Sequence, residues 1–161
     1  MPLSSTLEAV RPIELAEIYD ARVRIASTIV RTPLVRLELG RGYPDIRLKL
    51  ENLQPINAYK LRGAANAIAM LPDAERRRGV WTISAGNAGQ GVAYAARSAG
   101  VPCTVVAIET APRAKLERMK ALGATLVPVS YAVVVVIGSV GTPVIGVASL
   151  ISAQSPPVLV P

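Results

Sequence analysis

The chain has 161 residues, enough for one compact domain with a hydrophobic core or for half of a larger enzyme. It carries 18 Lys and Arg against 11 Asp and Glu, a formal net charge of +7, but the basic residues are scattered and aromatic residues make up only 4%. This pattern argues against a nucleic-acid partner. Histidine is absent, which removes the commonest metal ligand and general base, and one cysteine, Cys103, excludes an internal disulfide.

The N-terminal third predicts two helices separated by a strand. A helix is expected within residues 12–31, where apolar residues share one helical face and a Thr-Pro pair ends the pattern. The residues on this face are Leu15, Ile18, Ile25 and Ile29. Residues 46–50 alternate between apolar and charged side chains, as in a half-exposed strand. Residues 58–71 predict a second helix with one apolar side, ended by Pro72.

From residue 79 the chain alternates between strand and helix. The predicted strands are 79–84, 101–108 and 124–129, and the predicted helices are about 88–98 and 112–122. Gly100 and Gly123 follow the two helices as C-caps. Short loops between alternating elements predict an α/β fold with a parallel sheet and right-handed crossovers. Cys103 lies in the second strand, where we expect a buried structural thiol.

A change in composition near residue 130 separates an atypical tail. The last charged residue is Lys120, and residues 131–161 are uncharged and mainly apolar. Three interpretations of this tail stay open: one or two buried strands, a membrane span, or sequence from a shifted reading frame. Residues 132–151 reach the ~20 positions that a span needs, yet glycines and Pro143 interrupt them without a basic flank. The first 20 residues lack a signal-peptide pattern, so we expect a cytoplasmic protein without a membrane partner.

Two segments have the chemistry of a ligand site. Lys60 follows a turn and opens a helix, where the helix dipole disfavours an ammonium and thereby favours a nucleophilic amine. Taken alone, this position is also typical of a solvated surface lysine. Residues 84–91, Ser-Ala-Gly-Asn-Ala-Gly-Gln-Gly, join a strand to a helix, and their small side chains would let an anion approach the free N–H groups of the helix. A plain strand–helix connection explains this segment equally well.

The order of five motifs is more specific than either segment. They are Arg31-Thr-Pro-Leu34, Lys49-Leu-Glu-Asn-Leu-Gln54, Ala58-Tyr-Lys-Leu-Arg-Gly-Ala64, Ser84-Ala-Gly-Asn-Ala-Gly-Gln-Gly91 and Ala111-Pro-Arg-Ala-Lys-Leu116, followed by Leu122-Gly-Ala124. In this order they resemble the threonine dehydratase and serine racemase group of fold-type II pyridoxal-phosphate (PLP) enzymes, over about residues 12–130. The resemblance implies an α/β fold with a three-layer parallel sheet, of which this chain would hold the N-terminal half.

The resemblance also implies roles for individual residues. Lys60 would attach PLP through its amine and move the substrate α-proton, and Tyr59 would pack on the pyridine ring where the family usually has Phe. Asn87 would hydrogen-bond the phenolic oxygen of the cofactor. The backbone of Ser84, Ala85, Gly86 and Asn87 would hold the substrate carboxylate.

Three departures from the family pattern bear on activity. Ala88 replaces a histidine that many relatives carry, and Ala85 replaces the serine that racemases use as a second base, which favours dehydration over racemisation. The glycine loop that cradles the PLP phosphate in the family does not occur. We therefore expect a PLP-dependent ammonia-lyase of L-threonine or L-serine by descent. The alternatives are a PLP-dependent synthase of the cysteine or tryptophan-β type and an inert truncated fragment.

The expected organisation has three parts. Residues 1–50 would belong to the larger domain of such an enzyme, residues 51–130 would form the cofactor-lysine helix and a small α/β domain, and residues 131–161 would be the atypical tail. The expected partners are a small amino-acid substrate and, through uncovered apolar surface, further copies of the chain.

Overall fold

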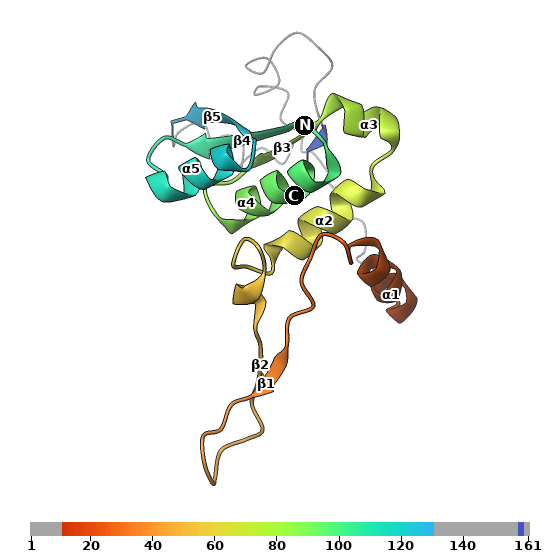
Figure 1. Cartoon of the computed structure of the whole chain (residues 1–161), viewed down its shortest axis with the longest axis vertical. Coiled ribbons are helices and arrows are strands. Elements are labelled where there is room, and N and C mark those ends of the chain that lie inside the picture. The colour runs from red at the N-terminus through yellow and green to blue at the C-terminus, as the bar shows by residue number, and fades with distance from the viewer. Residues whose placement is uncertain (1–10, 131–157, 160–161) are drawn as a thin grey trace, which may run out of the picture.

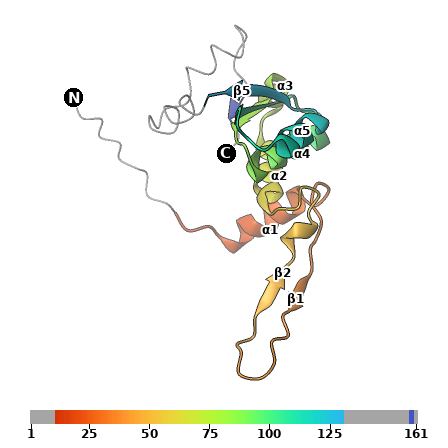
Figure 2. The same cartoon turned by 90° about the vertical axis from the view of Figure 1, so that its left-hand side faces the viewer.

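The computed structural model describes residues 11–130 and 158–159. Their N-terminal part contains two helices, a hairpin and a 3-10 turn. In chain order these elements are α1 (Leu15–Arg24), β1 (Leu34–Arg36), β2 (Arg47–Lys49), η1 (Glu51–Leu53) and α2 (Lys60–Met70). Strands β1 and β2 pair antiparallel, and their hairpin projects away from the rest of the molecule (Figures 1 and 2).

The following part alternates between helix and strand, as the sequence predicts from residue 79 onward. Its elements are α3 (Asp73–Arg78), β3 (Val80–Ile83), α4 (Asn87–Ala99), β4 (Cys103–Ile108), α5 (Arg113–Ala121), β5 (Thr125–Val129) and the short β6 (Val158–Leu159). The four strands form one parallel sheet in the order β5-β4-β3-β6. The predicted α/β class and parallel sheet are confirmed.

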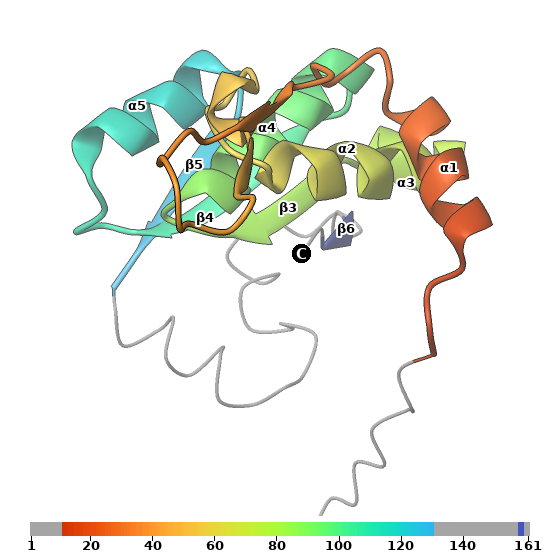
Figure 3. The same cartoon turned by 90° about the horizontal axis from the view of Figure 1, so that it is seen from below.

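The helices α2, α4 and α5 lie on one side of the sheet (Figure 3). Alternate strand residues point to opposite faces, so the sheet contributes to two apolar clusters. Val80 and Val105 belong to the cluster that the helices share, whereas Trp81 and Val106 belong to the second cluster. The main core therefore lies between the sheet and the layer formed by α2 and α4.

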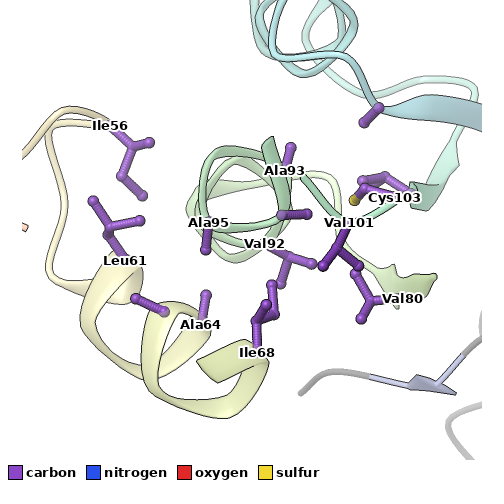
Figure 4. Packing of buried hydrophobic residues seen from close by; sticks show 14 of the residues in the cluster. Ile56, Leu61, Ala64, Ile68, Val80, Val92, Ala93, Ala95, Val101 and Cys103 are labelled. Atoms are coloured by element: carbon purple, nitrogen blue, oxygen red, sulfur yellow. The ribbon is translucent and has the colours of Figure 1, made fainter. Parts of the chain in front are cut away.

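Helices α2 and α4 pack closely because small residues line their contact. Ala64 of α2 and Ala95 of α4 are both buried, and the larger Leu61 and Ile68 fill the space beside them (Figure 4). Gly100 ends α4 in the left-handed conformation, with φ 65°, which L side chains rarely adopt. These packed helices carry the segments that the sequence singles out as ligand-binding.

The first helix differs from its prediction. It ends at Arg24 rather than near residue 31, and only Ile25 of the predicted face is buried; Leu15 and Ile18 are 62% and 55% exposed. The reason is tertiary. The buried amide of Gln54 donates to the carbonyl of Val30 at 2.8 Å and accepts its N–H at 3.1 Å, which holds this stretch outside a helix.

Strand β1 was not predicted, because only three exposed residues form it and pairing with β2 defines it. In the tail, Val158 and Leu159 form β6 beside β3, and the other predictions for residues 131–157 lie outside the described residues. Within residues 11–130 and 158–159, no helix is long and apolar enough to cross a membrane. The domain boundaries near residues 50 and 130 stay predictions.

Candidate active site

Lys60 is the first residue of α2, and its side chain is exposed. The next residue, Leu61, is completely buried and fixes the helix start in the core. The ammonium of Lys60 lies over the ring of Tyr59, 5.3 Å from its centroid, in a cation–π contact. Because the ring is 60% exposed, this contact leaves the amine within reach of a ligand.

The loop before Lys60 is fixed from two sides. Asn57 adopts a left-handed backbone conformation, with φ 57°. Its side-chain amide donates to the carbonyl of Asn52 at 3.0 Å, and its Oδ1 accepts a hydrogen bond from Arg118 of α5 at 3.1 Å. Arg118 also donates to the carbonyl of Pro55 at 2.8 Å. The loop is thereby tied both to the 3-10 turn and to α5.

The second predicted segment lies at the C-terminal end of β3. Ser84, Ala85 and Gly86 are half-buried, and Ser84 Oγ accepts the N–H of Gly86 at 3.1 Å, which closes a tight turn. Asn87 opens α4 and is exposed. No side chain of the described residues caps this helix, so the N–H groups of its first turn are available to an anion.

Gly91 brings the two segments together. A Cβ at Gly91 would lie 3.3 Å from the carbonyl carbon and oxygen of Lys60, so a glycine lets the two helices approach this closely. Asn87 precedes Gly91 by four residues and lies on the same face of α4, about 6 Å away along the axis. The structure therefore places the start of α2, at Lys60, against the N-terminal part of α4 that begins at Asn87.

A polar cluster supports the start of α2. The carboxylate of Glu51 accepts two hydrogen bonds from the guanidinium of Arg62, at 2.7 and 2.8 Å, and one from Thr32 Oγ1 at 2.5 Å. These bonds hold the pKa of Glu51 at about 2, chiefly through Arg62. No local pattern in the sequence predicts a role for these residues. Glu51 and Arg62 lie within the motifs that carry the resemblance, but nothing local in the sequence shows that they pair.

The arrangement suits a ligand with two groups. One is a carbonyl carbon that the amine of Lys60 can attack, and the other is an anionic group that the start of α4 can bind. Cys103 is not a competing nucleophile, because burial raises the pKa of its thiol to about 11. Across the part of the chain that the structure describes, no three Cys, Asp or Glu side chains gather as metal ligands would. The exposed amine of Lys60 is the nucleophile that the sequence predicts for this candidate site.

Comparison with known proteins identifies the class. The family of pyridoxal-phosphate dependent enzymes matches residues 25–142. The catabolic L-threonine dehydratase of Staphylococcus aureus (strain USA300) is 38% identical over 125 residues, which cover 76% of this chain and 36% of that protein. The solved serine racemase of Dictyostelium discoideum superposes with a TM-score of 0.71 at 36% identity, covering 74% of this chain and 40% of that one. Maize serine racemase gives a TM-score of 0.76 at 28% identity, covering 92% and 43%.

The chain belongs to the pyridoxal-phosphate dependent enzymes of fold-type II. Within them it is related to the threonine dehydratases and serine racemases, as the motif order predicts. It spans 36% of the length of the Staphylococcus aureus dehydratase.

The residues described fit the reactive end of this cofactor. An aldehyde needs an accessible amine, which Lys60 supplies, and Asn87 on the facing helix can hydrogen-bond a neighbouring oxygen. The uncapped start of α4 can hold a carboxylate. Residues 11–130 do not contain the glycine loop that holds the phosphate in the family.

Proposed function

We propose that this chain carries the lysine-bearing half of a PLP-dependent ammonia-lyase that converts L-threonine or L-serine into a 2-oxo acid and ammonia. The observation that supports the proposal is the close approach of two helix starts: α2, which opens with the exposed Lys60, and the uncapped N-terminal part of α4, which opens with Asn87. The relatedness to threonine dehydratases supports the reaction class.

Each residue has a defined task in this proposal. PLP, when bound, supplies the electron sink that acidifies the Cα–H bond of the substrate. The amine of Lys60 would hold the cofactor until the amine of the substrate takes its place. The freed amine of Lys60 would then accept the α-proton, after which the β-hydroxyl would leave as water and hydrolysis would release ammonia. The side chain of Asn87 would orient the cofactor ring by a hydrogen bond to the phenolic oxygen of the cofactor. The backbone N–H groups of Ala85 and of the first turn of α4 would bind the substrate carboxylate, while the N–H of Gly86 donates to Ser84 Oγ.

One position, Ala85, favours dehydration over racemisation. Racemisation needs a second base on the opposite side of Cα, and Ala85 has no group that could serve. Ala88, half-buried in the first turn of α4, adds no further acid or base. A PLP-dependent synthase is the alternative reaction, and it would require a second nucleophilic substrate. Threonine consumption without an added nucleophile separates the two.

The first test is covalent trapping. The purified chain is mixed with PLP, reduced with borohydride, and digested for mass spectrometry of the pyridoxyl adduct. Lys49, Lys115 and Lys120 serve as internal controls, because they are the other lysines of the chain. Labelling concentrated on Lys60 supports the proposal, and turnover of threonine is then assayed. Equal labelling of all four lysines would contradict it.

A further inference from the structure

The carboxylate of Glu51 joins three separate segments of the chain. It accepts hydrogen bonds from Thr32, which follows α1, from Arg62 in α2, and at 3.4 Å from Gln54, which follows η1. Its ion pair with Arg62 is bidentate and shielded, with the side chains 18% and 33% exposed. Because the guanidinium is planar and donates two parallel hydrogen bonds, the pair fixes the orientation of the Arg62 side chain as well as its distance from Glu51.

The neighbours of the pair are themselves immobilised. Gln54 is only 1% exposed and binds both backbone groups of Val30. Lys49 donates from its Nζ to the backbone carbonyl of Thr32. Glu51 is therefore a fixed anchor, and the guanidinium of Arg62 is docked on it.

The pair acts on the side of α2 away from Lys60. Successive helical residues turn by about 100°, so Arg62 points about 200° around the axis from Lys60. Between them, Leu61 is buried in the core, and the backbone of Lys60 lies against Gly91. The first turn of α2 is thus held at three positions around its axis, which fixes the direction in which Lys60 leaves the helix.

We propose that Glu51 and Arg62 are positioning residues for Lys60, which fix the rotation of the first turn of α2 without contacting cofactor or substrate. The role of Lys60 rests on the proposed function, whereas the positional effect of the pair does not depend on a bound cofactor.

The experiment uses the full chain with Arg62→Lys and Glu51→Gln. Arg62→Lys keeps the positive charge but removes the planar guanidinium and its two parallel hydrogen bonds. It therefore separates the effect of bidentate geometry from that of charge attraction alone. Glu117→Gln is the matched control, because it breaks an exposed pair with Lys120 at 3.5 Å. Two readouts are taken: hydrogen exchange of the apo chain by mass spectrometry, and the share of pyridoxyl adduct on Lys60.

We expect exchange to accelerate locally. The amides of residues 63–67 bond to carbonyls of residues 59–63, at the start of α2. Their protection should fall in both variants by more than that of α4 and β4, which reports only the change in overall stability. The adduct share of Lys60 should fall about tenfold, as small misplacements of a reacting group cause. The control should match the parent in both readouts.

Three results would overturn the inference. One is unchanged exchange at residues 63–67 in Arg62→Lys, and another is a loss of protection spread evenly over the chain, which marks a general stability effect. The third is an undiminished adduct share on Lys60 in both variants. If the parent chain itself shows no selective labelling, the proposed function fails, and the exchange data alone then decide whether the pair positions α2.

Discussion

At the residue scale, the stability of the start of α2 depends on pH, because Glu51 must be ionised to pair with Arg62. Its pKa lies at about 2, below the ordinary value of 4.5, mainly because Arg62 donates to the carboxylate. A lowered pKa in the folded state means stability that is present above about pH 4.5 and lost as pH falls toward 2. A fully shielded shift of this size would contribute about 3 kcal/mol, and partial exposure reduces it to about 1–2 kcal/mol.

We therefore predict that Glu51→Gln destabilises the chain by about 1–2 kcal/mol at pH 7 and that this difference shrinks as the pH falls from 5 to 2. Urea unfolding of both proteins across this range measures the effect. Glu117→Gln should show little difference at any pH, because its exposed pair with Lys120 is screened. A difference for Glu51→Gln that stays constant with pH would argue against the assignment.

Cys103 provides a second prediction for a single residue. The side chain is buried on β4, and burial raises the pKa of its thiol to about 11, so only about 0.1% is thiolate at pH 8. A disulfide reagent should react with the native chain at least about a hundredfold more slowly than with the chain in denaturant. The absorbance of the released thiol follows the reaction. Equal rates in both conditions would show that Cys103 is not in a closed core.

At the element scale, the contact between α2 and α4 depends on Gly91. A methyl group there would meet the backbone of Lys60 at 3.3 Å, and a backbone gives way less easily than a side chain end. We expect Gly91→Ala to cost about 1–3 kcal/mol and to lower the adduct share of Lys60. Gly63→Ala is the control, because Gly63 lies in α2 with nothing within 4 Å of the added methyl. It should be neutral or stabilising.

Thermal unfolding and adduct mapping of these two alanine variants test the contact directly. Both substitutions add one methyl group to a helical glycine, so they differ only in what that methyl meets. Equal stability and equal Lys60 labelling in the two variants would mean that the helices can separate at no cost. The loop before Lys60, tied to α5 through Arg118, provides the other restraint on this element.

At the scale of the whole molecule, apolar side chains remain uncovered on α1 and the hairpin. Leu15 is 62% exposed, Ile18 55% and, on β1, Leu34 58%. Exposed apolar surface of this kind favours association. We predict that the chain self-associates in a concentration-dependent way.

Light scattering of the purified chain tests this prediction. Leu15→Gln with Ile18→Gln should shift the distribution toward the monomer, because glutamine preserves helix propensity while removing apolar area. Met70→Gln is the control, since Met70 is equally exposed, at 62%, on another helix. A monodisperse monomer of the parent chain at every concentration would refute the prediction.

The sequence by itself determined the alternation of helix and strand from residue 79 onward and placed the candidate groups within it. Apolar periodicity, capping glycines and prolines are local signals, and they predicted α2, α4, α5 and strands β2 to β5 closely. Lys60 at a helix start and the turn from Ser84 to Asn87 at the end of a strand follow from the same local patterns. Only the family resemblance predicted that the two segments form one site. Taken alone, Lys60 could be a solvated surface lysine and residues 84–91 a plain strand–helix connection.

Only the tertiary structure decided how these segments meet. The pairing of Glu51 with Arg62 joins residues 11 apart, and the bond from Arg118 to Asn57 joins residues 61 apart. The bonds that hold Val30 outside a helix come from Gln54, which lies 24 residues further along the chain. No local sequence pattern predicts such contacts, because they depend on which side chains the packed helices bring within hydrogen-bond distance.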